Sequence, residues 1–191
     1  MDILVLGDSW ASAVEADTGR DAGWPQIMGI PDTHRQGISG STAAEWAADL
    51  DGRLTHAMGT QARCVIISLM GNDARAAVED GRVTARELAD ALASMRHVVN
   101  ACRRPRTVVL LYADPYGGTQ TQSSIAVPLI NAAIRAACLG LNVVYADTGA
   151  WLQPEHFDGH DIHPTHAGHH VIAERMRALC GEGRLPIAGG Q

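Results

Sequence analysis

The sequence contains no lysine, so all fifteen of its basic residues are arginine. Acidic residues number 21, and the resulting net charge of −6 argues against a basic surface for nucleic acid. No apolar run approaches the roughly 20 residues of a membrane-spanning helix. The chain enters its first apolar run at Ile3 without the charged region or the cleavage site of an export signal. We therefore expect no nucleic-acid partner, no membrane span and a cytoplasmic location by default, with unconventional export or carriage in a phage particle left open.

The sequence also lacks the motifs of common cofactor sites. It has neither a glycine-rich dinucleotide fingerprint nor a phosphate-binding loop, which would need a lysine. The four cysteines stand far apart in apolar surroundings and never at CxxC spacing: Cys64, Cys102, Cys138 and Cys180. We expect them to be free, buried thiols rather than zinc ligands or a disulfide framework, and we expect no cofactor.

Four short runs rich in valine and isoleucine predict the strands of a parallel sheet: Ile3–Leu6, Cys64–Leu69, Thr107–Tyr112 and Asn142–Tyr145. None of them alternates with polar residues, as expected of strands that are buried on both faces. A shorter strand near Thr33–Gln36 brings the predicted number to about five. With 191 residues and no linker, residues 1–191 are predicted to form one domain with a loose tail after about residue 181.

Segments with helical periodicity fill the intervals between these runs. Thr42 and Thr84 each have a glutamate three residues later, which is the form of a capping box at the start of a helix. Two further helices are predicted over Ile130–Cys138 and from about Thr165 to Cys180. Pro128 stands near the start of the first, and Gly181 ends the second. The alternation of strands and helices predicts an α/β domain with three layers, α/β/α.

In such a sheet, ligands bind outside the carboxyl ends of the strands, where unusual blocks of residues occur here. The blocks read Gly7-Asp8-Ser9-Trp10, Gly37-Ile38-Ser39-Gly40-Ser41-Thr42, Gly71-Asn72-Asp73 and, near the C-terminus, Asp161-Ile162-His163-Pro164-Thr165. Each block alone has an ordinary structural explanation: Ser9 can cap a helix, Gly40 can be a loop glycine, and Asn72 can shape a turn. Their joint occurrence in this order favours a functional site.

Together the four blocks resemble the GDSL-type, or SGNH, family of serine hydrolases, over nearly the whole chain. The four residues that give the family its name fall here on Ser9, Gly40, Asn72 and His163. The first block ends in tryptophan where the family name has leucine, at a position that varies within the family. The resemblance implies a flavodoxin-like α/β/α sandwich that hydrolyses esters, thioesters or amides without a cofactor.

The chemistry of ester hydrolysis accounts for these residue types. Ser9 would attack the carbonyl while His163 accepts its proton, because a serine hydroxyl is a weak nucleophile without a neighbouring base. The resulting oxyanion needs hydrogen-bond donors that are already in place. The resemblance assigns this role to the backbone N–H groups of Ser9 and Gly40 and to the side-chain amide of Asn72. Water activated by His163 would then release the acid from the acyl-enzyme.

The acid that orients the histidine is the least determined part of this site. Family members place an aspartate three residues before the histidine, where this sequence has His160. Asp161 can orient His163 if the segment is extended, because residues two apart then project to the same side. If the segment forms a helical turn, Asp158 or a backbone carbonyl takes that place. Asp161 is the preferred candidate, and Asp8 is expected to hydrogen-bond the backbone of its own turn.

Histidines are concentrated near the C-terminus: His156, His160, His163, His166, His169 and His170. His166 and His170 have the spacing of two metal ligands on one face of a helix. No zinc motif accompanies them, so we expect no functional metal. The histidines other than His163 are expected on a solvated polar face.

The length of the chain is near the minimum for such a fold and leaves little room for a lid, which favours small or accessible substrates. We predict an esterase that acts on short acyl or acetyl esters of a small molecule or a carbohydrate. A lysophospholipase, a thioesterase or a catalytically weak binding module fits the same residues. A metal-dependent hydrolase that uses the histidines is the remaining alternative. The sequence makes no prediction of the oligomeric state.

Overall fold

The structure is a computed structural model that describes residues 3–12, 22–54, 62–73, 84–117, 121–159 and 162–181. Among these residues, five parallel strands form one sheet in the order β2-β1-β3-β4-β5: β1 (Ile3–Gly7), β2 (Arg35–Gly37), β3 (Cys64–Ser68), β4 (Arg106–Leu111) and β5 (Val144–Asp147). This order confirms the predicted flavodoxin-like sheet of five strands. The strand β2 begins later than its predicted range, because Asp32–His34 form a short 3₁₀ turn, η1, before it.

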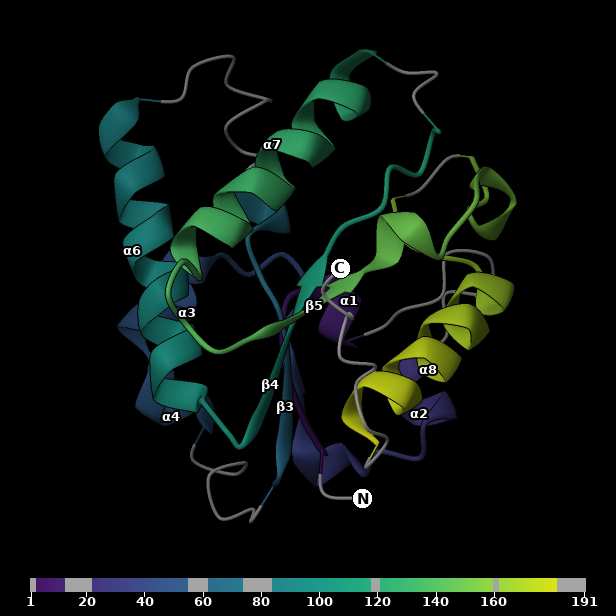
Figure 1. Cartoon of the computed structure of the whole chain (residues 1–191), viewed down its shortest axis with the longest axis horizontal. Helices are drawn as coiled ribbons and strands as arrows, with labels where there is room; N and C mark the ends of the chain where they lie inside the picture. The colour runs from purple at the N-terminus through teal and green to yellow at the C-terminus, as the bar shows by residue number, and fades with distance from the viewer. Residues whose placement is uncertain are drawn as a thin grey trace, which may run out of the picture.

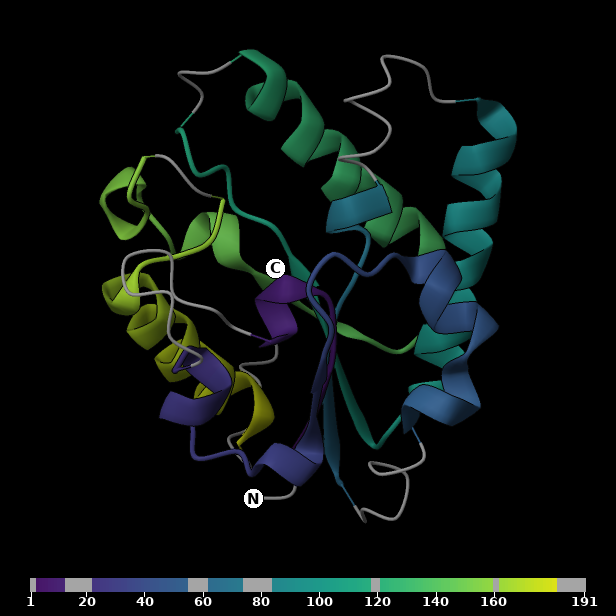
Figure 2. The same ribbon diagram turned by 180° about the vertical axis from the view of Figure 1, so that it is seen from behind.

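Helices cover both faces of the sheet, as the predicted three layers require (Figure 1). One face carries α1 (Ser9–Ser12), α2 (Trp24–Ile27) and α8 (His166–Cys180), and the other carries α3 (Ala43–Ala48), α4 (Leu50–Leu54), α6 (Ala85–Cys102) and α7 (Thr121–Ala137). The same division is visible from behind (Figure 2). Two 3₁₀ turns, η2 (Thr148–Ala150) and η3 (Pro154–His156), follow β5. Within the part of the chain that the structure describes, no helix is long and apolar enough to cross a membrane.

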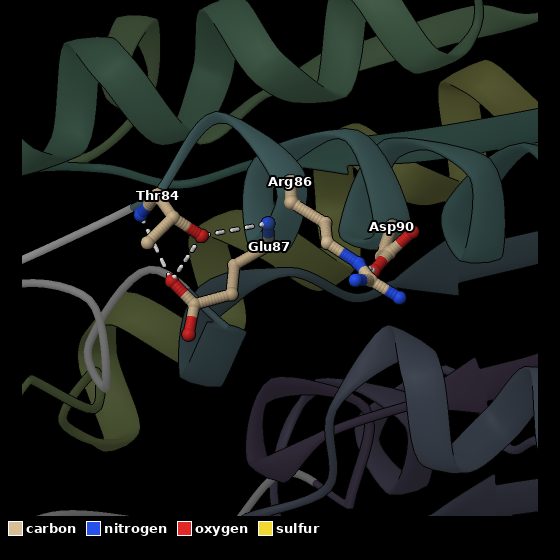
Figure 3. A network of polar contacts seen from close by, with 4 residues as sticks. All are labelled: Thr84, Arg86, Glu87 and Asp90. Atoms are coloured by element: carbon tan, nitrogen blue, oxygen red, sulfur yellow. Dashed lines mark hydrogen bonds and ion pairs between the residues drawn. The ribbon is translucent and has the colours of Figure 1, made fainter.

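Both predicted capping boxes are present. At the start of α3, the Thr42 hydroxyl accepts a hydrogen bond from the Glu45 N–H (3.2 Å), and the Glu45 carboxylate accepts one from the Thr42 N–H (2.9 Å). Thr84 and Glu87 repeat this exchange at the start of α6 (Figure 3). Each box satisfies N–H groups that the first turn of a helix leaves without partners, and so fixes where the helix begins.

The helix α7 is longer than predicted. It begins at Thr121 rather than near Ile130, so Pro128 lies inside the helix and not near its start. An interior proline removes a backbone hydrogen bond and costs about 3 kcal/mol in an isolated helix. Pro128 is exposed, whereas Ile130 and Ile134 are buried against the core. This packing of the C-terminal half offsets the local cost, and tertiary contacts therefore override the sequence signal.

The core lies on both sides of the central strands. All residues of β1 and β3 are buried, which explains why their sequences do not alternate with polar residues. Trp24 of α2 and Trp46 of α3 are fully buried and pack from opposite faces of the sheet. The four cysteines are buried and free, as predicted. The tail after residue 181 lies outside the described residues.

Candidate active site

The candidate nucleophile Ser9 follows a sharp turn at the carboxyl end of β1. Gly7 has φ = +141°, and a Cβ atom at this position would lie 1.8 Å from the carbonyl oxygen of Ser68 in β3. Directly after it, the Asp8 N–H donates a hydrogen bond to that same oxygen (2.8 Å). Glycine is therefore required at position 7 both by the backbone conformation and by the contact between β1 and β3. The turn leaves Ser9 buried at the carboxyl edge of the sheet.

Ser9 is the first residue of α1, but it is not the residue that caps this helix. The Asp8 carboxylate accepts a hydrogen bond from the Trp10 N–H (3.0 Å), and the Asp8 carbonyl accepts from the N–H groups of Ala11 and Ser12 (3.0 Å each). These bonds make Asp8 the N-cap. The alternative in which Ser9 serves to cap a helix is therefore wrong. The expected hydrogen bond between Asp8 and the backbone of its own turn is confirmed.

Asp8 also joins three strands through a buried network. Its carboxylate accepts hydrogen bonds from the hydroxyl of Ser68 at the end of β3 (3.0 Å) and from the hydroxyl of Tyr112 just after β4. Burial raises the pKa of Asp8 to about 6, against the opposing effect of these hydrogen bonds and of the nearby positive charge of His163. The network connects the turn before Ser9 to the neighbouring strand β3 and to the residue that follows β4, the next strand in the sheet.

The second block forms a tight loop after β2. The hydroxyl of Ser41 donates to the Ile38 carbonyl (2.7 Å) and accepts from the indole N–H of Trp46 (2.9 Å). Gly40 is exposed with φ = +78°, and no heavy atom lies within 4 Å of where its Cβ would be. The left-handed backbone conformation, and not crowding by the protein, therefore accounts for glycine at position 40.

The third block connects to the second. The Asn72 side-chain amide donates to the carbonyl of Ser41 (3.0 Å), and the Asp73 carboxylate accepts from the Ala43 N–H at the start of α3 (3.0 Å). An amide nitrogen carries two N–H groups, so Asn72 retains a second donor. Met70, immediately before this block, has φ = +87°, a strained conformation for a residue with a side chain. The structure thus joins the loops of Gly40 and Asn72, which follow β2 and β3 at the carboxyl edge of the sheet.

His163 lies in a loop that is closed at its base. Phe157 and Pro164 form an isolated antiparallel bridge, and both the N–H and the hydroxyl of Thr165 donate to the His156 carbonyl (2.9 and 3.1 Å). His163 is half-buried, and its Nε2 atom is shielded from solvent. The pairing of His163 with Ser9 as base and nucleophile stays a prediction.

The preferred acid, Asp161, lies outside the described residues, as does His160. The alternative Asp158 is described and is exposed. The identity of the orienting group therefore stays a prediction.

The expectation of a solvated face for the remaining histidines is wrong for His169. This side chain is buried, because positions 169, 172, 173 and 176 form the inward face of α8 at helical spacing. His166 and His170 are exposed, with their Nε2 atoms 3.0 Å apart. Among the described residues, no three His, Cys, Asp or Glu side chains are grouped as metal ligands would be.

A cleft of about 610 Å³ opens beside this site, at the carboxyl ends of β4 and β5. Its lining includes Tyr112, Asp114, Leu152 and Gln153. Tyr112 therefore borders the cleft and also bonds the turn of Ser9. Tyr112 and Ser68 are the site residues that sequence reasoning missed, although each stands at the carboxyl end of a predicted strand, where polar residues indicate function.

The sheet order and the blocks at its carboxyl edge define the SGNH hydrolase fold. Residues 5–171 match the model of the GDSL-like lipase/acylhydrolase family, and the chain belongs to this family. It is accordingly an enzyme of the carboxylic ester hydrolase class. No curated protein sequence matches the chain.

Solved structures with the same fold resemble nearly the whole chain at low sequence identity. An acetylxylan esterase from Geobacillus stearothermophilus is 16% identical with a TM-score of 0.70, and 95% of this chain and 94% of that chain are covered. Catalytic mutants of that esterase replace a serine, an aspartate or a histidine by alanine. An α/β hydrolase from the metagenome of Lake Arreo, Spain, is 17% identical with a TM-score of 0.70 and 94% of each chain covered.

Proposed function

We propose that the chain hydrolyses carboxylic esters through an acyl-enzyme formed on Ser9. His163 accepts the Ser9 proton during attack on the ester carbonyl and then donates a proton to the leaving alcohol. Water activated by His163 attacks the acyl-enzyme and releases the acid. Asp161 orients the imidazole, with Asp158 or a backbone carbonyl as the alternatives.

The backbone N–H groups of Ser9 and Gly40 and the side-chain amide of Asn72 receive the oxyanion in this proposal. Their support is the hydrogen bond from Asn72 to Ser41, which fixes the amide next to the Gly40 loop. Donors that are fixed before the reaction stabilise developing charge without reorganisation. The open space at Gly40 leaves room for the substrate on the same side.

The observation that carries the proposal is the buried position of Ser9 at the start of α1, where Asp8 provides the cap instead. A serine that is not needed as a cap, on a turn that follows β1 at the carboxyl edge of the sheet, suits the role of nucleophile. A catalytically weak binding module would have no need of this arrangement.

For the substrate, we propose short acyl or acetyl esters, with the alcohol in the cleft beside Tyr112. The cleft has a mixed lining, in which Asp114 and Gln153 can hydrogen-bond the hydroxyl groups of an alcohol such as a carbohydrate. The acetylxylan esterase activity named for the similar structures agrees with this choice. A lysophospholipase or a thioesterase would use the same catalytic residues with a different cleft occupant.

Labelling of the protein with a small fluorophosphonate tests the mechanism directly. We expect a covalent adduct that mass spectrometry maps to Ser9 in the wild type and that is lost in Ser9→Ala, with Ser12→Ala as the matched control on the same helix. Absence of an adduct on the folded wild type would contradict an activated serine.

The substrate is tested separately, by comparing acetylated xylo-oligosaccharides with a lysophospholipid and an acyl thioester. We expect the highest kcat/KM for the acetylated oligosaccharides. A preference for the long-chain lipid would overturn the substrate assignment while leaving the catalytic residues in place.

A further inference from the structure

Two of the four cysteines lie in direct contact, although they are far apart in the chain. Cys64 is the first residue of β3 and Cys180 is the last residue of α8. Their sulfur atoms are 2.8 Å apart, across a sequence separation of 116 residues. Both side chains are buried, with exposed fractions of 2% and 8%. The pair lies at the opposite end of β3 from Ser68 and plays no part in the candidate active site.

A positive charge accompanies this pair. Arg106, the first residue of β4, is the register partner of Cys64, and its guanidinium donates a hydrogen bond to the carbonyl of Gly181, the residue after Cys180 (3.3 Å). The hydrogen bond between Cys64 and Cys180 and the charge of Arg106 lower the pKa of Cys64, whereas the pKa of Cys180 is raised. Such an asymmetric pair has one thiol suited to attack and a second within reach to resolve the product.

The other two cysteines lack this environment. Burial raises the pKa of both Cys102 and Cys138 to about 11, which disfavours the reactive thiolate. They are therefore controls that are buried like the pair and that we expect to react more slowly.

We propose that Cys64 and Cys180 are a redox-sensitive pair that hydrogen peroxide converts into a disulfide between β3 and α8. The Cys64 thiolate attacks one oxygen of the peroxide, the O–O bond breaks, and Cys64 becomes a sulfenic acid as hydroxide leaves. That hydroxide takes the proton of Cys180, and the Cys180 thiolate attacks the Cys64 sulfur and expels a second hydroxide. This second hydroxide takes the proton that Cys64 released on ionising, so in total two thiols lose two protons and two electrons, and one hydrogen peroxide becomes two waters.

The bond would fasten the far end of α8 to the centre of the sheet. The near end of this helix is already fixed by Thr165, which bonds the His156 carbonyl and accepts from the Gly168 N–H. Closing a long loop restricts the unfolded chain, so the oxidised form resists unfolding more strongly. The active site is at the other edge of the sheet, and ester hydrolysis is expected to stay unchanged.

The test uses the reduced wild-type protein treated with hydrogen peroxide. We expect a mass loss of about 2 Da, and a rise of about 5–15 °C in Tm that dithiothreitol reverses. Trypsin cleaves after Arg63 and Arg177, so digestion without reductant separates the two cysteines unless a disulfide joins their peptides. The joined peptides identify the bond in the wild type, without need of a variant.

Variants complete the experiment. Cys180→Ala is expected to abolish both the joined peptides and the rise in Tm, whereas Cys102→Ala and Cys138→Ala keep both. Oxidation that stops at a sulfinic acid on Cys64, a disulfide that includes Cys102 or Cys138, or a bond that forms only in denaturant would overturn the proposal. None of these outcomes bears on the reaction at Ser9.

Discussion

The hydroxyl of Tyr112, just beyond β4, donates a hydrogen bond to the carboxylate of Asp8, which caps the helix that begins at Ser9. Both side chains are buried, and burial together with the charge of Asp8 raises the pKa of Tyr112 well above its ordinary value. Tyr112 therefore stays a donor at any pH at which the protein is studied. Because Tyr112 also borders the cleft, it connects the turn before Ser9, the proposed nucleophile, to the wall of the proposed alcohol site.

Asp8 makes stability depend on pH in an unusual direction. Its pKa rises from 3.8 to about 6 on folding, so between these values the folded state binds more protons than the unfolded state. The free energy of unfolding should then fall as pH rises from about 4 to about 6, by an amount of about 3 kcal/mol. Asp8→Asn removes the titration and should flatten this decline in urea unfolding curves. Asp90→Asn, exposed on α6, should retain it, and an equal decline in both variants would contradict the assignment.

We expect Asn72 to contribute more to stabilising the transition state than to stabilising the folded protein. Asn72→Ala removes the proposed oxyanion donor and should lower kcat about 100-fold or more with little change in KM. Loss of its bond to Ser41 should lower the free energy of unfolding by only about 1 kcal/mol. Steady-state kinetics and chemical unfolding measure the two effects separately. Asn100→Ala, on the exposed face of α6, is the control and should leave both unchanged.

Gly40 and Gly140 offer a matched comparison, because their φ angles are +78° and +77° and nothing lies within 4 Å of either Cβ position. Substitution by alanine should cost each about 1 kcal/mol of stability through backbone strain. Gly40→Ala should also lower kcat, since it reorients a proposed oxyanion donor, whereas Gly140→Ala should not. Equal activity of the two variants would remove Gly40 from the oxyanion hole. Thermal unfolding with parallel rate measurements decides between these outcomes.

The orienting acid is tested by comparing Asp161→Asn with Asp158→Asn. The substitution at the true partner of His163 should lower kcat by about 10⁴-fold, because the imidazole loses its tautomer and orientation. We expect this loss in Asp161→Asn and near wild-type rates in Asp158→Asn. The reverse result would transfer the role to Asp158, and a small effect of both would favour a backbone carbonyl.

Local signals made much of the fold predictable. The apolar runs located the strands, because strands buried on both faces consist mainly of apolar residues. Thr42 and Thr84 located two helix starts, because their capping partners stand three residues away. The start of α7 was not predictable, since Pro128 is an unfavourable signal that only the burial of Ile130 and Ile134 overrides.

The candidate site also has residues that the sequence predicts and contacts that it does not predict. The positions of Ser9, Gly40 and Asn72 follow from strand ends and were predicted from the sequence. The contact between Asp8 and Tyr112 spans 104 residues, and no local pattern encodes a contact that depends on the strand order. The same holds for the contact between Cys64 and Cys180.

The bridge between Phe157 and Pro164 affects how far the sequence of the enclosed loop can vary. It closes the loop before Thr165 starts α8, so the helix and the histidine beside it are anchored independently of the loop tip. We therefore expect insertions, deletions or substitutions at the loop tip to leave His163 in place. In the proposed assignment of Asp161, the acidic partner is displaced by one position from its usual place, and this displacement falls within the sequence between the two residues of the bridge.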